Sequence, residues 1–132
     1  MENNRLGKLE LEEEYSITPI MQEVYRRLRT NIEFTGMENR VICFSSVTSN
    51  DGKSVVTYNL ARTFAQNGKA TLLIDADMRN SVLHKRLSYD SSQPGLSHYL
   101  AGKNHMLECM YETNIRNFYI MPSGVFPKNP AE

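Results

Sequence analysis

The fold is decided by residues 41–54, which read VICFSSVTSNDGKS. The first four are apolar and favour β-structure, which predicts a strand buried on both faces. A polar turn follows, and then a helical pattern that ends at Asn67-Gly68, where glycine suits the left-handed position that closes a helix. Residues 70–74 form a second apolar strand pattern that ends at Asp75. Strand, loop, helix and strand within about 35 residues predict a βαβ unit, and therefore an α/β fold with a parallel sheet and flanking helices.

The pattern outside this unit predicts four more elements. A helix is expected from Pro19 to about Phe34, with Thr18 as its N-cap and a stop near Gly36. Its apolar face is marked by residues four apart: Ile20, Val24, Leu28 and Ile32. Short helices are expected at 82–87 and 95–101, and a third strand at 117–121. Residues 1–18 are acidic and poor in apolar anchors, so we expect a solvated, mobile arm.

Composition limits the functions that this chain can have. Its 132 residues allow one domain. The 15 Lys+Arg balance the 15 Asp+Glu, so the chain has no overall positive charge that would attract nucleic acid or an anionic membrane. No apolar run is long enough to span a bilayer and no secretory signal is visible, so a cytoplasmic location is expected. Of the two cysteines, Cys43 lies in the first apolar run and is expected to be a buried, reduced thiol.

The turn after the first predicted strand has the character of a phosphate-binding loop. Gly52-Lys53-Ser54 fits the end of the GxxxxGK[ST] pattern, although Val47 stands where the first glycine belongs. Amides at a helix N-terminus converge on an anion, Lys53 can reach the β- and γ-phosphates, and the Ser54 hydroxyl can ligate Mg²⁺. Asn50 suits a position with positive φ. We predict nucleotide contacts from Ser49, Asn50, Asp51, Gly52, Lys53, Ser54 and Val55. The alternative is a plain turn with a surface lysine.

Two carboxylates follow the second predicted strand. Asp75 and Asp77 come at its carboxyl end, where open parallel sheets bind their ligands. There they can hold Mg²⁺ or its waters, and one can accept a proton from an attacking hydroxyl. The alternative is a turn or helix cap. We predict that Lys53, Asp75 and Asp77 are catalytic and that Ser54, Asp75 and Asp77 hold the metal.

Several further motifs occur in one order along the chain: residues 23–32 (EVYRRLRTNI), the Gly52-Lys53-Ser54 loop, residues 73–79 (LIDADMR), 95–97 (GLS), 100–102 (LAG) and 122–132 (PSGVFPKNPAE). With these motifs, residues 19–132 closely resemble the bacterial protein-tyrosine kinases of capsule and exopolysaccharide synthesis, in their separate cytoplasmic form. The resemblance implies a P-loop NTPase-like α/β domain related to the cell-division and plasmid-partition ATPases. It also implies ATP and Mg²⁺ as cofactors.

The resemblance assigns further roles. Glu23, Arg26 and Arg29 match an ExxRxxR motif through which such kinases assemble into rings, and residues at this spacing share one side of a helix. The alternative is a solvated charged face. A membrane-anchored protein that controls polysaccharide chain length and activates the kinase through its cytoplasmic tail is the implied partner. Nucleic acid is not expected, because neither a basic stripe nor an aromatic platform occurs.

Two departures from the family pattern leave alternatives open. Thr48 stands where the partition ATPases carry a second lysine, which argues against that branch. The family's later strand ending in a metal-binding aspartate, and its tyrosine-rich tail, do not occur in this sequence. Residues 19–132 are therefore interpreted as the N-terminal portion of a kinase domain, in a fragment or a truncated product. The competing interpretations are a partition-type ATPase and a catalytically inactive assembly module.

Overall fold

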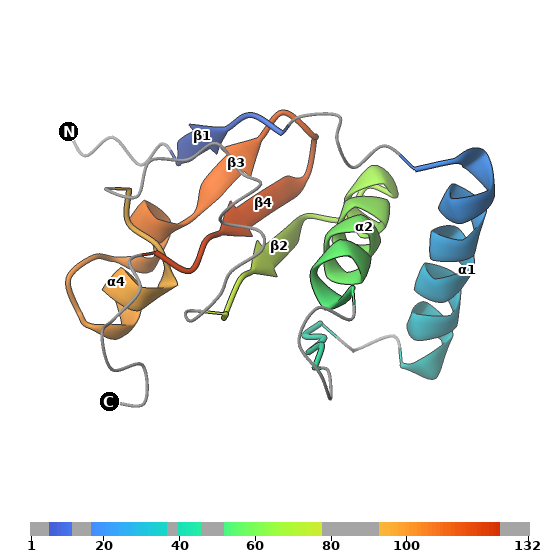
Figure 1. Ribbon diagram of the computed structural model, residues 1–132, viewed down its shortest axis with the longest axis horizontal. Helices are drawn as coiled ribbons and strands as arrows, with labels where there is room; N and C mark the ends of the chain where they lie inside the picture. The colour runs from blue at the N-terminus through green and yellow to red at the C-terminus, as the bar shows by residue number, and fades with distance from the viewer. Residues whose placement is uncertain (1–5, 12–16, 37–39, 46–51, 78–92, 125–132) are drawn as a thin grey trace.

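The computed structural model describes residues 6–11, 17–36, 40–45, 52–77 and 93–124. A four-stranded sheet lies at the centre, α2 packs against it, α1 packs on the outside of α2, and α4 lies at the opposite end (Figure 1). The elements are, in chain order, β1 (Gly7–Leu9), α1 (Pro19–Thr35), α2 (Lys53–Gln66), β2 (Thr71–Ile74), α4 (Leu96–Leu100), the short 3-10 helix η2 (Met106–Cys109), β3 (Tyr111–Thr113) and β4 (Phe118–Met121). None of the helices in these ranges has the length and apolarity needed to cross a membrane.

The sheet is mixed, whereas the sequence predicted a parallel one. Its strand order is β1-β3-β4-β2. The pairs β2–β4 and β1–β3 are parallel, but β3 and β4 are antiparallel because the short turn at 114–117 joins them directly. The predicted strands at 70–74 and 117–121 are confirmed, with Leu73 opposite Ile120 and Ile74 opposite Met121.

The predicted strand at Val41–Phe44 is wrong. Residues 40–45 form no strand and lie beside the amino end of α2, apart from the sheet (Figure 1). Val41 is 84% exposed, and Cys43, expected to be buried, is exposed as well. An apolar run of β-formers becomes a strand only where it pairs with a neighbouring strand, and residues 40–45 pair with none of the four strands described, although β2 lies at an edge of the sheet. The predicted βαβ unit therefore lacks its first strand among the described residues.

Part of the segment expected to be a solvated arm belongs to the core. Gly7–Leu9 forms β1, and the backbone of Leu11 exchanges hydrogen bonds with the Asn114 side chain, at 2.8 Å from its N–H and 3.3 Å to its carbonyl. Leu9 and Leu11 are buried. A Cβ at Gly7 would lie 2.6 Å from Cδ1 of Tyr111, so the close approach of β1 to that ring requires glycine. Sequence reasoning overlooked this strand because three residues carry too little periodicity to detect.

The predicted helices in the described ranges are confirmed. In α1 the Thr18 hydroxyl accepts a hydrogen bond from the Met21 N–H at 3.2 Å, and the helix ends before Gly36. In α2 the closing Gly68 has φ of 84°. The helix at 95–101 is α4, which is followed by Gly102 with φ of 74°. The helix predicted at 82–87 lies outside the described residues.

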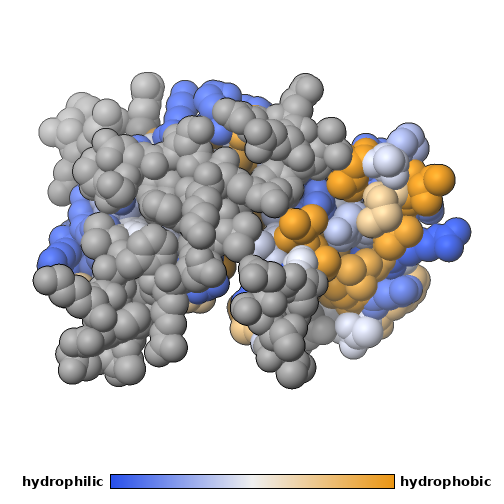
Figure 2. Space-filling view, in the orientation of Figure 1, coloured by the Kyte–Doolittle hydropathy of each residue, from blue (hydrophilic) through white to orange (hydrophobic). Residues whose placement is uncertain are grey.

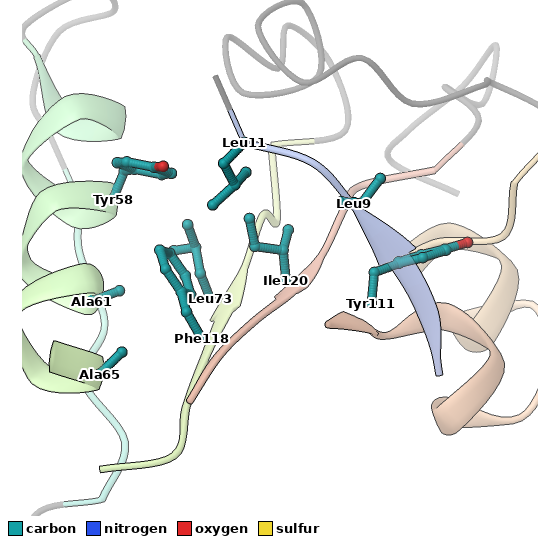
Figure 3. Close-up of a cluster of buried hydrophobic side chains, with 9 residues drawn as sticks. All are labelled: Leu9, Leu11, Tyr58, Ala61, Ala65, Leu73, Tyr111, Phe118 and Ile120. Carbon is teal, nitrogen blue, oxygen red and sulfur yellow. The ribbon is translucent and has the colours of Figure 1, made fainter. Parts of the chain in front are cut away.

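The core lies between α2 and the sheet (Figure 3). Its buried side chains are Leu9, Leu11, Tyr58, Ala61, Ala65, Leu73, Tyr111, Phe118 and Ile120. The small Ala61 and Ala65 let α2 approach Leu73 and Phe118, and the Tyr58 and Phe118 rings meet with centroids 5.5 Å apart. This packing holds α2 against β2, and so sets which end of α2 lies at the same sheet edge as the carboxyl end of β2.

Candidate functional site

The first turn of α2 is shaped by Gly52. This residue is the N-cap, and its φ of 86° lies in the left-handed region that favours glycine. The helix begins at Lys53, and the Val56 N–H is the first to bond back, to the Gly52 carbonyl at 3.0 Å. The first amides of a helix precede its i→i−4 hydrogen bonds and point toward its start, where the helix dipole adds partial positive charge. Nothing lies within 4 Å of where a Cβ of Gly52 would be, so the conformation rather than the space requires glycine.

The side chains that follow Gly52 are half-buried at this helix start. Lys53, Ser54 and Val55 are therefore placed as the sequence predicted, on the first turn of a helix. The preceding residues 46–51 lie outside the described ranges. The nucleotide contacts predicted for Ser49, Asn50 and Asp51, and the positive φ predicted for Asn50, remain predictions.

The two aspartates form one hydrogen-bonded turn after β2. The Asp75 N–H donates to the Met121 carbonyl at 3.0 Å, which extends the β2–β4 ladder by one bond. The Asp77 N–H then donates to Oδ1 of Asp75 at 3.1 Å. Asp75 thus has the turn role that the alternative interpretation gave it. That hydrogen bond occupies one of the roughly four acceptor positions of a carboxylate, so a turn role and a metal-binding role are compatible in one side chain.

The helix start and the aspartate turn lie at the same edge of the sheet. Both the first turn of α2 and the carboxyl end of β2 point to the lower side of Figure 1, and α2 packs on β2. Leu73 is on the face of β2 that α2 covers (Figure 3), and Asp75 is the first residue after the strand. The fold therefore places the first turn of α2 and the Asp75–Asp77 turn at the same edge of the sheet, although a helix and a strand separate them in the sequence.

This donor set fits Mg²⁺ bound together with phosphates. In the described ranges no cluster of three or more His, Cys, Asp or Glu side chains is present, so no site enclosed by protein ligands alone is found there. Mg²⁺ retains several waters and is usually held by one or two carboxylates plus substrate phosphates. Asp75, Asp77 and the Ser54 hydroxyl have the oxygen donors that such a partial shell would need, and Lys53 would be the cation for the phosphates.

The charged residues of α1 separate into two groups. Glu23 and Arg26 are more than half exposed and lie 3.7 Å apart, whereas the Arg29 side chain is 18% exposed and its Nε lies 3.8 Å from Oε1 of Glu33. The same Glu33 oxygen contacts Nζ of Lys69 at 3.1 Å. A groove of about 400 Å³ lies on α1 and is lined by Glu23, Arg26, Arg27, Arg29, Thr30 and Asn31. Sequence reasoning gave Glu33 no role, although its position four residues after Arg29 is a signal for a helical ion pair.

The amino half of α1 is also apolar on its exposed side. Ile20 is 78% exposed and Val24 is 50% exposed, while Leu28 and Ile32 are half-buried. Figure 2 shows apolar residues gathered on the side of the molecule that α1 and α2 form. The predicted apolar face is therefore used by the fold only in its second half.

Residues 39–126 carry the similarity that shows the family of this chain. A family model described as an AAA domain matches residues 39–126, which is more than half of the chain and includes Lys53 and both aspartates. The chain belongs to this AAA domain family. The P-loop interpretation of residues 46–54 agrees with that membership.

The chain is also similar to several bacterial tyrosine kinases. The chain is 40% identical over 110 residues to the tyrosine-protein kinase CpsD of Streptococcus agalactiae, covering 83% of this chain and 48% of that one. It is 40% identical over 117 residues to the tyrosine-protein kinase wzc of Salmonella typhi, covering 87% of this chain and 16% of that one. A solved BceF tyrosine kinase domain is similar in structure, with a TM-score of 0.76 and 35% identity, covering 92% of this chain and 49% of that one. The chain spans about half the length of CpsD.

Proposed function

We propose that this chain binds ATP with Mg²⁺ and acts as an autophosphorylating protein-tyrosine kinase that regulates capsular or exopolysaccharide synthesis and export. Residues 19–132 are, in this proposal, the N-terminal portion of the kinase domain. The proposal is supported by the tyrosine kinases among the relatives and by the site geometry.

One observation carries the proposal. The left-handed Gly52 starts α2 at the same sheet edge where Asp75 and Asp77 form their turn. A phosphate-binding helix start and two carboxylates at the end of the adjacent strand are the two parts that nucleotide-dependent phosphoryl transfer requires. A chance GKS tripeptide at the start of a surface helix would not be expected to share its sheet edge with two carboxylates at a strand end.

The roles of the residues follow from their chemistry. The amides of residues 49–55 would surround the phosphates and Lys53 would donate to the β- and γ-phosphate oxygens. Ser54, Asp75 and Asp77 would hold Mg²⁺, which neutralises phosphate charge. An aspartate not occupied by the metal would accept the proton of the attacking tyrosine hydroxyl. Asp75 is already oriented by the Asp77 N–H, and so is held in place before any ligand arrives.

The surface of α1 supports self-association. Glu23 and Arg26 present opposite charges to solvent, next to the exposed apolar Ile20 and Val24. We propose that this side of α1, with Arg29 at its far end, packs against a second copy in a ring. We also propose that the chain acts in the cytoplasm and is recruited to the membrane by the cytoplasmic tail of a membrane-anchored polysaccharide chain-length protein.

Product analysis tests the activity. The full chain is incubated with γ-labelled ATP and Mg²⁺, and labelled phosphotyrosine is separated from free phosphate, with Lys53→Met as the control. Label on tyrosine in the parent and not in the variant supports the kinase. Free phosphate alone indicates a partition-type ATPase, and oligomers without turnover indicate an assembly module. Either of these results overturns the kinase proposal.

A further inference from the structure

The carboxyl end of β4 is held by the start of α4. The Leu96 N–H donates to the Pro122 carbonyl at 2.8 Å and the Ser97 N–H donates to the Ser123 carbonyl at 2.9 Å. The Gly95 N–H donates to Nδ1 of His98 at 3.0 Å. Pro122 and Ser123 are fully buried. We call this contact between residues 95–98 and 122–124 the glycine junction, because Gly95 and Gly124 lie at its centre.

Neither glycine has room for a side chain. A Cβ at Gly95 would lie 2.5 Å from the Gly124 nitrogen and 2.5 Å from the Pro122 oxygen, which are backbone atoms that cannot turn away. A Cβ at Gly124 would lie 2.5 Å from Oγ of Ser97 and 2.9 Å from Nδ1 of His98. Gly124 also has φ of 86°. The two backbones are therefore in direct contact, which only glycine permits.

The glycine junction is connected to Asp75 by a short path. Met121 precedes Pro122, and its carbonyl accepts the Asp75 N–H at 3.0 Å. Asp75 in turn orients the Asp77 N–H. Two hydrogen bonds from α4 thus fix the segment to which Asp75 is bonded. At this end of the sheet the β2–β4 pairing has finished, so the ladder alone leaves Asp75 at a fraying end.

We propose that Gly95 and Gly124 are positioning residues for the metal-binding aspartates. By holding the end of β4, the glycine junction fixes the backbone of Asp75, and through it the Asp75–Asp77 turn, in the geometry that binds Mg²⁺ with the nucleotide. The metal part of this inference rests on the proposed function; the backbone part does not.

Amide hydrogen exchange tests the backbone part without any ligand. Gly124→Ala is compared with Gly102→Ala, a matched control that also has positive φ, at the other end of the same helix α4, with nothing within 4 Å of its Cβ position. We expect the Asp75 amide to exchange about tenfold faster in Gly124→Ala than in Gly102→Ala, with the Leu73 amide unchanged. Equal Asp75 rates in the two variants overturn the inference.

A second substitution separates positioning from general damage. Ser97→Ala removes the oxygen that a Cβ at position 124 would meet at 2.5 Å. We expect Ser97→Ala/Gly124→Ala to recover part of the slow Asp75 exchange that Gly124→Ala loses, because Nδ1 of His98 at 2.9 Å still meets the new Cβ. This double variant also serves if Gly124→Ala does not fold, and it is then compared with Gly102→Ala. Asp75 exchange in a folded double variant as fast as in Gly124→Ala shows that the Ser97 contact is not the cause and overturns the inference.

Calorimetry with ATP tests the metal part. With EDTA, we expect Gly124→Ala and Gly102→Ala to have equal ATP affinity. With Mg²⁺, we expect Gly124→Ala alone to bind about tenfold more weakly than the parent, because misplaced carboxylates lose the metal. Equal Mg²⁺-dependent gains in both variants overturn the metal role of the glycine junction. A parent protein without Mg²⁺-dependent ATP binding overturns the proposed function itself, and the exchange result then still decides the backbone part.

Discussion

Nζ of Lys69 lies 3.1 Å from Oε1 of Glu33, and this contact links α1 to the turn that leads into β2. The same carboxylate oxygen lies 3.8 Å from Nε of Arg29. Glu33 therefore lies between two cations from different elements. The contact adds one link between the carboxyl-terminal half of α1 and the turn between α2 and β2.

We expect Lys69→Ala to lower the free energy of unfolding by about 0.5 kcal/mol, the usual size for a solvent-exposed ion pair. Lys69 is 56% exposed, so screening by salt is strong, and the difference from the parent should vanish near 1 M NaCl. Urea unfolding at low and high salt measures this. Arg27→Ala is the control, because its 3.7 Å pair with Glu23 lies within one helix and links no second element. A loss that persists at high salt would mean that Lys69 acts through packing.

We expect Glu23→Ala/Arg26→Ala to lower the mass measured by light scattering without changing stability by more than about 0.5 kcal/mol. Both side chains are exposed, and in the described residues their ion pairs join only Glu23, Arg26 and Arg27 of the same helix, so the fold loses little. Arg29 stays in place, because it is mostly buried beside Glu33 and its removal would confuse assembly with stability.

The control for this pair is Lys103→Ala/Arg116→Ala, which removes two exposed cations away from α1. An unchanged mass in the α1 variant, at a concentration where the parent associates, would show that this side of α1 is not the interface.

The elements that could be predicted from the sequence are those with local signals. Thr18 and Pro19 start α1, Gly68 ends α2, and Pro122 follows β4, and each of these effects depends on near neighbours in the chain. The strand at 41–44 was predicted wrongly because the apolar pattern says nothing about which sheet edge is open. The β1 strand depends on contacts with Tyr111 and Asn114, more than 100 residues away.

The candidate site divides in the same way. Lys53 at a helix start and Asp75 at a strand end follow from the loop pattern and from the apolar run before the aspartates. The hydrogen bond from Asp77 to Asp75 and the glycine junction do not, because they depend on tertiary backbone geometry. Gly95 and Gly124 lie in two of the motifs that carry the family resemblance, but neither motif indicates that the two glycines meet in the fold.

We expect Lys53→Met to abolish measurable ATP binding while leaving the thermal midpoint within a few degrees of the parent. Methionine retains most of the aliphatic part of the side chain, and the helix start is formed by backbone atoms, so loss of the ammonium group should affect folding little. ATP binding should be lost because the ammonium group is the proposed donor to the phosphates. Calorimetry and a thermal melt measure the two effects. Lys103→Met, at an exposed position, is the control. Equal ATP affinity in parent and Lys53→Met would remove Lys53 from the site.

Stability should fall at alkaline pH through Cys109. Burial raises the pKa of this thiol, the charge of Glu108 raises it further, and a backbone hydrogen bond from Tyr99 opposes them. The folded state then binds the thiol proton more tightly than the unfolded state, so this stabilising contribution is complete below the unfolded pKa and decreases above about pH 8.5. We expect Cys109→Ala to show a shallower loss of stability between pH 8 and 10 than the parent, by urea unfolding at each pH. Cys43→Ala, at an exposed thiol, should follow the parent slope.

The aspartate turn makes the sharpest prediction about the metal. Asp75→Asn/Asp77→Asn removes two negative charges but keeps a side-chain carbonyl at position 75, which can still accept the Asp77-position N–H. The turn should therefore persist, and the unfolding free energy should change by less than about 1 kcal/mol. Any loss of function then comes from charge and metal binding, not from a changed fold.

ATP brings several negative charges to a site that already holds two carboxylates. Without a divalent ion the like charges oppose binding, so in EDTA the double variant should bind ATP as well as the parent or better. With Mg²⁺ the sign reverses, because the ion bridges the phosphates and the carboxylates then attract the complex. We expect Mg²⁺ to strengthen ATP binding in the parent by at least about tenfold more than in the double variant, as measured by calorimetry with EDTA and with Mg²⁺. An equal Mg²⁺ effect in the two proteins would mean that Asp75 and Asp77 only shape the turn and that the metal is held elsewhere.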